Sequence, residues 1–173
     1  MGNIESAKQD DQRVTSAWDP LIELIDDVKT LEIKNTLSDH SYVTEYYRHN
    51  WDICHERPIQ HVVHVTLCPG AITAWHMHKF KSDNIVVPTG MIKLVLFDGR
   101  KGSPTEGKVN VFNMSPLRPM VVGFPPGIWH GFHNLLSSEN SSFINISDGA
   151  YNYEQPDEWR LPLDTPEIPF TFS

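Results

Sequence analysis

Apolar and polar residues past residue 28 are arranged in short segments, without the long three-to-four spacing of an amphipathic helix. The segments predicted to be strands are Tyr42–Tyr47, Gln60–Leu67, Ile72–His78, Asn84–Val87, Met91–Phe97, Val109–Phe112, Met120–Phe124 and Ser142–Ser147. Turn-forming pairs separate them, such as Pro69-Gly70, Thr89-Gly90 and Asp98-Gly99. Short strands punctuated by proline and glycine predict an all-β sandwich or small barrel.

The two ends of the chain have different patterns. Residues 1–17 are polar and charged, and we expect a flexible N-terminal tail. In Asp19–Val28 an Asp-Pro pair precedes closely spaced apolar residues, which predicts a short N-terminal helix. From Gln155 onward prolines are frequent, so this part is expected to pack as an extended strap with short helical turns. Residues 18–173 are therefore predicted to form a single domain.

Composition excludes several classes of partner. The chain has 173 residues, with 22 acidic and 14 basic side chains and a formal net charge of −8. This charge, with no basic run, argues against nucleic acid or an anionic membrane as a partner. The apolar runs are far shorter than a membrane span. Only Cys54 and Cys68 are present, too few for a disulfide framework, so a reducing cytoplasm is the expected compartment.

Four residues predict a metal site. His76 and His78 are one residue apart in a predicted strand, so both side chains point to the same face, while Trp75 and Met77 point outward or toward a partner. Asp83 can join the two histidines if the chain turns back, and His130 follows a second turn. Imidazoles and a carboxylate suit a divalent ion of Fe, Mn, Ni, Zn or Cu. Four protein ligands leave two positions of an octahedral ion open for substrate.

The spacing around these residues resembles the two motifs of the cupins. Gly70 to Gly90 matches G-x5-H-x-H-x4-D-x6-G, with Asp83 in place of the usual glutamate, and Pro125 to Asn134 matches P-x-G-x2-H-x3-N. Both motifs are long and they match independently. The resemblance implies a double-stranded β-helix, the jelly roll of the cupin superfamily, with a substrate site in its interior.

Most of the chain is also similar to the dTDP-4-dehydrorhamnose 3,5-epimerase family of cupins. The similar stretches are S-D-H-S-Y-V-T-E-Y-Y-R (38–48), I-K-L-V-L-F-D-G-R-K-G-S-P-T-E-G-K (92–108) and V-V-G-F-P-P-G-I-W-H-G-F (121–132). The resemblance implies nucleotide-linked 4-keto sugars as substrates and a homodimer that shares strands. It also implies catalysis without metal, in which a histidine removes the proton beside the ketone and a tyrosine returns one. His76 falls on the position of that histidine.

The sequence departs from this family at the positions that carry its chemistry. Thr73 and His40 stand where the family has arginines, His78 stands where it has a glutamine, and Asp83 stands where it has a lysine. Ile144 (or Asn145) stands where it has the tyrosine. Asp164 is at best an offset counterpart of the carboxylate that orients the base. Replacing a lysine by aspartate and adding a histidine favours a cation over an enolate or a phosphate. Losing two arginines removes bidentate phosphate contacts.

These observations lead to one main hypothesis and three alternatives. The main hypothesis is a metal-binding cupin that isomerises or epimerises a keto-sugar or a similar carbonyl compound, with the ion stabilising an enediolate. The alternatives are a metal-free nucleotide-sugar epimerase or ketoisomerase with His76 as base, an Fe- or Cu-dependent oxygenase, and a non-catalytic sugar-binding protein. The sequence does not identify a general base under the main hypothesis. Glu45 and Tyr151 are further candidates for pocket residues.

Overall fold

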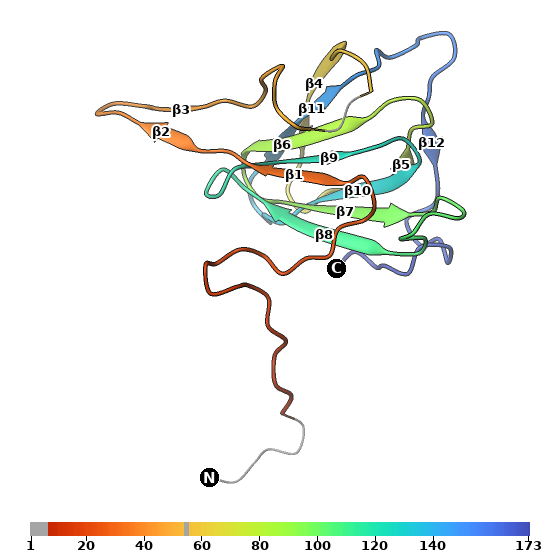
Figure 1. Cartoon of the computed structure of the whole chain (residues 1–173), viewed down its shortest axis with the longest axis horizontal. Helices are drawn as coiled ribbons and strands as arrows, with labels where there is room; N and C mark the ends of the chain where they lie inside the picture. The colour runs from red at the N-terminus through yellow and green to blue at the C-terminus, as the bar shows by residue number, and fades with distance from the viewer. Residues whose placement is uncertain (1–6, 54–55) are drawn as a thin grey trace.

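The computed structural model describes residues 7–53 and 56–173, in which two five-stranded antiparallel sheets face each other and a two-stranded hairpin projects from one end (Figure 1). The first sheet has the order β1 (Lys29–Glu32), β9 (Met120–Phe124), β6 (Asp83–Thr89), β11 (Ser141–Ser147) and β4 (His61–Leu67). The second has the order β12 (Trp159–Arg160), β5 (Ile72–Met77), β10 (Ile128–Asn134), β7 (Ile92–Asp98) and β8 (Val109–Met114). The hairpin joins β2 (Asn35–Leu37) to β3 (Tyr42–Thr44).

The predicted all-β double-sheet fold is confirmed. Each of the eight predicted strands has a counterpart, although the strand predicted to run to residue 47 ends at Thr44 and the one predicted over 84–87 extends over 83–89. Four strands were missed, namely β1, β2, β10 and β12. Three of these have only two to four residues, too short for a recognisable alternation.

The predicted N-terminal helix is wrong, because no residue from 19 to 28 is helical. Val28 N–H makes a single turn-type bond to the Ile25 carbonyl, and other backbone groups of this segment bond to side chains far away in the sequence. Asn110 accepts from the Ile25 N–H at 2.8 Å and donates to the Glu23 carbonyl at 3.0 Å. These bonds hold Ile25 in the core, where it is 1% exposed. Tertiary contacts therefore override a weak local helix signal.

The core fills the space between the two sheets, and further apolar clusters cover their outer faces. The central cluster includes Leu94, Leu96, Val122 and Phe124, all nearly inaccessible to solvent. On the outer face of the second sheet, the C-terminal strap places Phe170 and Phe172 against Trp75. Trp75 was expected to point outward or toward a partner, but its exposed fraction is 0% because the chain's own C-terminal strap covers it.

The β2–β3 hairpin and the described part of the N-terminal tail lie outside the core. The β2–β3 hairpin exposes three large side chains, Leu37, Tyr42 and Val43. Of the predicted N-terminal tail, residues 1–6 lie outside the described residues, and Val14 forms a bridge with Pro20. Cys68 is an exposed free thiol, and Cys54 lies outside the described residues. Among the described residues, no helix is long and apolar enough to cross a bilayer; the cytoplasmic location stays a prediction.

Candidate active site

β5 lies between β10 and β12, and this arrangement surrounds His76. In the register of the second sheet His76 is opposite His130 on one side and opposite Arg160 on the other. The pairing of β5 with β10 shifts between this point and Phe132, which pairs with Thr73. The irregularity brings Thr73 and His76 onto one face although they are three residues apart, a separation that regular strands place on opposite faces.

A cavity of about 550 Å³ opens at this end of the two sheets. Its wall includes residues from both sheets and from the segment after β11. The polar residues that matter for chemistry are His76, His78, Lys81, His130, Asn145, Tyr151, Tyr153, Glu158 and Arg160. Apolar side chains such as Val65, Phe132 and Phe143 form the rest of the wall. A concave site with an apolar lining and a few converging polar groups is typical of a small-molecule site.

His76 is held as a neutral ring whose Nε2 is a hydrogen-bond acceptor for its neighbours. Nε2 lies 3.1 Å from Arg160 Nη1 and 2.9 Å from Thr73 Oγ1. A guanidinium group can only donate, so Nε2 accepts and the ring hydrogen is on Nδ1. Burial, followed by the charge of Arg160, lowers the pKa of His76 to about 4. At neutral pH the ring can therefore accept a proton but cannot supply one.

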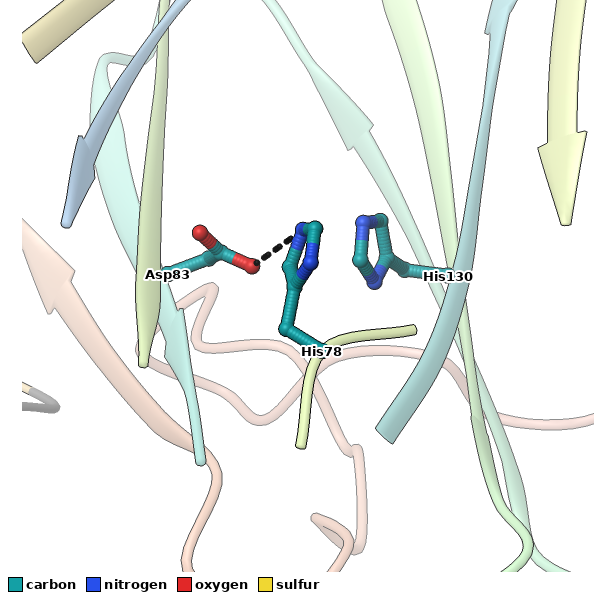
Figure 2. A group of neighbouring side chains, drawn as sticks. All are labelled: His78, Asp83 and His130. Atoms are coloured by element: carbon teal, nitrogen blue, oxygen red, sulfur yellow. Dashed lines mark ion pairs between the residues drawn. The ribbon is translucent and has the colours of Figure 1, made fainter. Parts of the chain in front are cut away.

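Three buried side chains form a second group beside His76 (Figure 2). His78 directly follows β5, Asp83 opens β6 and His130 lies within β10. One ligand atom from each lies within 4.8 Å of the other two. His78 Nε2 is 3.4 Å from Asp83 Oδ2. The chain therefore brings two imidazoles and one carboxylate to one point, as a divalent transition metal requires.

Burial shifts the acid–base equilibria of this second group. It raises the pKa of the Asp83 carboxyl, although the nearby His78 ring and the hydrogen bond from Asn145 act in the opposite direction. The pKa of His130 lies well below its ordinary value because the ring is buried and the His78 and His76 rings lie close to it. His130 is therefore a neutral ring at physiological pH.

The structure brings three of the four predicted metal ligands together and leaves His76 outside the group. The His76 and His130 rings are stacked with centroids 5.8 Å apart, but His76 Nε2 is engaged by Thr73 and Arg160. Of the other two pocket candidates, Tyr151 lines the cavity, whereas Glu45 lies in a different hollow beside Trp51.

Of the residues that correspond to functional positions of the family, some line the cavity and others do not. Asn145 lines the cavity and donates to Asp83 Oδ1 at 2.8 Å. His40 and Asp164 are exposed in turns and do not line the cavity. Within the single chain, neither contacts the cavity wall that contains His76.

Sequence reasoning missed three charged residues of the site. Arg160 on β12 and Lys81, two residues before β6, place two cationic groups in the cavity wall. The carboxylate of Glu158 lies 3.4 Å from Lys81 Nζ and 3.7 Å from His78 Nδ1. No motif marks these positions; the only sequence signal was that W-R-L-P-L-D-T-P-E-I-P-F resembles the family's C-terminus.

The double-sheet jelly roll with an interior histidine site defines the class of protein as a cupin. The sequence model of the dTDP-4-dehydrorhamnose 3,5-epimerase family matches residues 23–172, and the chain belongs to this family.

Three individual proteins illustrate the relationship. A probable low-salt glycan biosynthesis epimerase, Agl13 of Haloferax volcanii, is 33% identical and covers 81% of this chain and 89% of its own length. The spore coat polysaccharide biosynthesis protein SpsL of Bacillus subtilis is 31% identical over 87% of this chain and 97% of its own. A dTDP sugar isomerase structure from Desulfovibrio desulfuricans has a TM-score of 0.77 at 24% identity, covering 85% and 91% of the two chains, which supports the fold.

Proposed function

We propose that this chain is an epimerase or ketoisomerase of nucleotide-linked 4-keto sugars and that His76 is its base. The observation that carries the proposal is the neutral His76 ring, whose Nε2 lone pair lies in the wall of a substrate-sized cavity. Membership of the dTDP-4-dehydrorhamnose 3,5-epimerase family supports the substrate class. Removing a proton from the carbon beside a ketone needs a base within hydrogen-bond reach, and a positioned imidazole serves this role.

Arg160 and Lys81 are proposed to bind the diphosphate of the nucleotide. Both line the cavity, and the Lys81 side chain is only 11% exposed. A guanidinium group pairs with phosphate through two parallel N–H donors, and lysine provides a point charge. When the diphosphate draws Arg160 away from His76, the Nε2 lone pair becomes available and the ring becomes more basic, since a neighbouring positive charge is neutralised.

Tyr151 is proposed to return the proton. The positions that correspond to the family's tyrosine, Ile144 and Asn145, carry no group that can act as an acid. Tyr151 lines the same cavity and is 37% exposed, whereas the neighbouring Tyr153 is 88% exposed. Both phenols line the cavity, but the less exposed one is held more firmly toward the substrate. Tyr151→Phe is therefore expected to slow product formation more than Tyr153→Phe.

The test is to incubate the enzyme with a dTDP-linked 4-keto-6-deoxyhexose in D₂O and to follow the sugar by NMR. Deuterium is expected to enter at the carbon next to the ketone, together with formation of an epimer or keto isomer. His76→Asn is expected to lower the rate by about 10² to 10⁴, the usual contribution of a general base. His133→Gln, on the same strand as His130 but outside the cavity wall, is the control and should retain activity.

Two outcomes would contradict the proposal. The first is that His76→Asn exchanges deuterium at the wild-type rate. The second is that the wild-type protein binds the nucleotide sugar without exchange or turnover, which would identify a sugar-binding protein instead of an enzyme.

A further inference from the structure

We propose that His78, Asp83 and His130 bind one divalent transition-metal ion and that His76 does not belong to the ligand set. This goes beyond the proposed reaction and does not depend on it, because the base, His76, has other partners. The three side chains are 6%, 1% and 4% exposed, so none is a chance surface group. They come from the residue after β5, the first residue of β6 and the interior of β10, and they converge inside the protein (Figure 2).

Backbone carbonyls fix the orientation of both histidine rings. His78 Nδ1 lies 2.5 Å from the carbonyl oxygen of Asp157, and His130 Nδ1 lies 3.2 Å from that of Ile128. A carbonyl oxygen can only accept, so each Nδ1 carries a hydrogen, and the neutral form of each ring presents Nε2 as its free ligand atom. Metal-binding histidines characteristically donate their second ring N–H to a carbonyl or carboxylate in this way.

With both rings neutral and the carboxyl ionised, the state that binds a metal, the atoms that face one another in this group are all acceptors. The bare Nε2 of His78 points at Asp83 Oδ2, and His130 presents its own ligand nitrogen within 4.8 Å. Asn145 holds the carboxylate in place through Asp83 Oδ1, and its own buried Oδ1 has no hydrogen-bond partner among the described residues. Buried acceptors without a donor between them repel each other, and a bound cation removes that cost.

The spacing favours a metal ion over a shared proton. An N–H···O hydrogen bond has heavy atoms about 2.7–3.2 Å apart. The separation of His78 Nε2 and Asp83 Oδ2 is 3.4 Å. Two ligands each about 2.1 Å from one ion at a tetrahedral angle are about 3.4 Å apart. Two imidazoles and one carboxylate suit a divalent first-row ion such as Zn²⁺ or Fe²⁺.

His76 is excluded by its contacts. Its Nε2 is 3.1 Å from the Arg160 guanidinium, whose positive charge opposes a second cation at that atom. An ion bound by the other three residues would leave positions facing the cavity, where it would act as a Lewis acid toward a substrate oxygen. The distinguishing expectation is a three-residue site that survives the loss of His76.

The test measures metal binding directly. Untagged full-length protein is treated with chelator, dialysed and titrated with Zn²⁺ by calorimetry, with metal content checked by mass spectrometry. Wild type and His76→Asn are expected to bind one equivalent with the same affinity. Asp83→Asn and His130→Asn are each expected to lower the affinity at least 100-fold. His133→Gln, a histidine of β10 outside the cavity, is the matched control and should bind as wild type.

A folding defect is separated from loss of a ligand by circular dichroism and thermal melting of each variant without metal. If Asp83→Asn does not fold, His78→Gln replaces it, and the visible absorption of bound Co²⁺ is compared between this variant and the wild type. No uptake of Zn²⁺ by the wild type, or unchanged affinity in the folded ligand variants, would overturn the site. Loss of binding in His76→Asn would overturn the three-residue assignment. Metal binding without sugar turnover would leave this site standing while refuting the proposed reaction.

Discussion

The contact between Arg160 and His76 gives a prediction whose size can be worked out. Arg160→Gln removes the guanidinium charge and keeps a side chain that can still donate an N–H. In metal-free protein the pKa of His76 is expected to rise from about 4, because the charge of Arg160 is the second cause of its depression. Burial is the first cause and remains, so the pKa stays below its ordinary value of 6.5.

The expected rise follows from distance and solvent exposure. Arg160 Nη1 is 3.1 Å from His76 Nε2, and the arginine is exposed. Two unit charges about 4 Å apart interact by about 1 kcal/mol in water and by about 4 kcal/mol at an effective dielectric constant of 20. Exposure favours the lower figure, which corresponds to a rise of about 0.7 in the pKa. We therefore expect a pKa just below 5 in the variant.

The assay is an NMR pH titration of the His76 ring, assigned by its absence in His76→Asn. Arg118→Gln is the matched control, since it removes an exposed arginine that pairs with Glu32 and changes the net charge equally. In the active enzyme the acid limb of kcat/KM should move up with the pKa, and KM should rise because a phosphate contact is lost. An unchanged His76 pKa in Arg160→Gln would refute the contact and the tautomer inferred from it.

The same shift has a consequence for stability. A histidine whose folded pKa is lowered binds protons more readily in the unfolded state. The folded protein is therefore expected to lose stability as the pH falls from about 6.5 toward 4, and Arg160→Gln should reduce this loss. Urea unfolding across that range measures it.

Three further predictions concern stability and assembly. Trp75→Ala should lower the free energy of unfolding by about 3–5 kcal/mol in urea titrations, because the side chain is 0% exposed and packs on Phe172. Asp98→Asn should destabilise the protein at neutral pH, because burial alone would raise the pKa of the Asp98 carboxyl but hydrogen bonds from Arg100 and neighbouring hydroxyls hold it well below its ordinary value of 3.8. The free energies of unfolding at pH 7 and at pH 3 should therefore differ less in this variant than in wild type. Leu37→Glu should shift the mass measured by light scattering from dimer to monomer if the exposed β2–β3 hairpin forms the homodimer that the family predicts.

The sequence predicted the fold well because its signals are local. Turn pairs such as Pro69-Gly70 mark strand ends, and Gly70 has the positive φ of 65° that favours glycine. The H-x-H spacing placed His76 and His78 in the wall of one cavity, as strand alternation requires.

The parts that could not be predicted depend on contacts between distant residues. The helix expected near Ile25 was lost to hydrogen bonds with Asn110, 85 residues further along the chain. Arg160 faces His76 only because β12 pairs with β5, and a two-residue strand leaves no pattern to recognise. The separation of His76, which contacts Arg160, from the buried group of His78, Asp83 and His130 is likewise set by tertiary neighbours and not by spacing.

The position of β5 between β10 and β12 also determines when the site can form during synthesis. His76 leaves the ribosome long before His130, and Arg160 lies 84 residues after His76 in the chain. Until β12 pairs, one edge of β5 is open, and open edges are where nascent chains join each other. A chain stalled before residue 159 would hold most of both sheets, but the histidine would lack its guanidinium partner. Synthesis of β12 therefore completes the second sheet and the Arg160–His76 contact together.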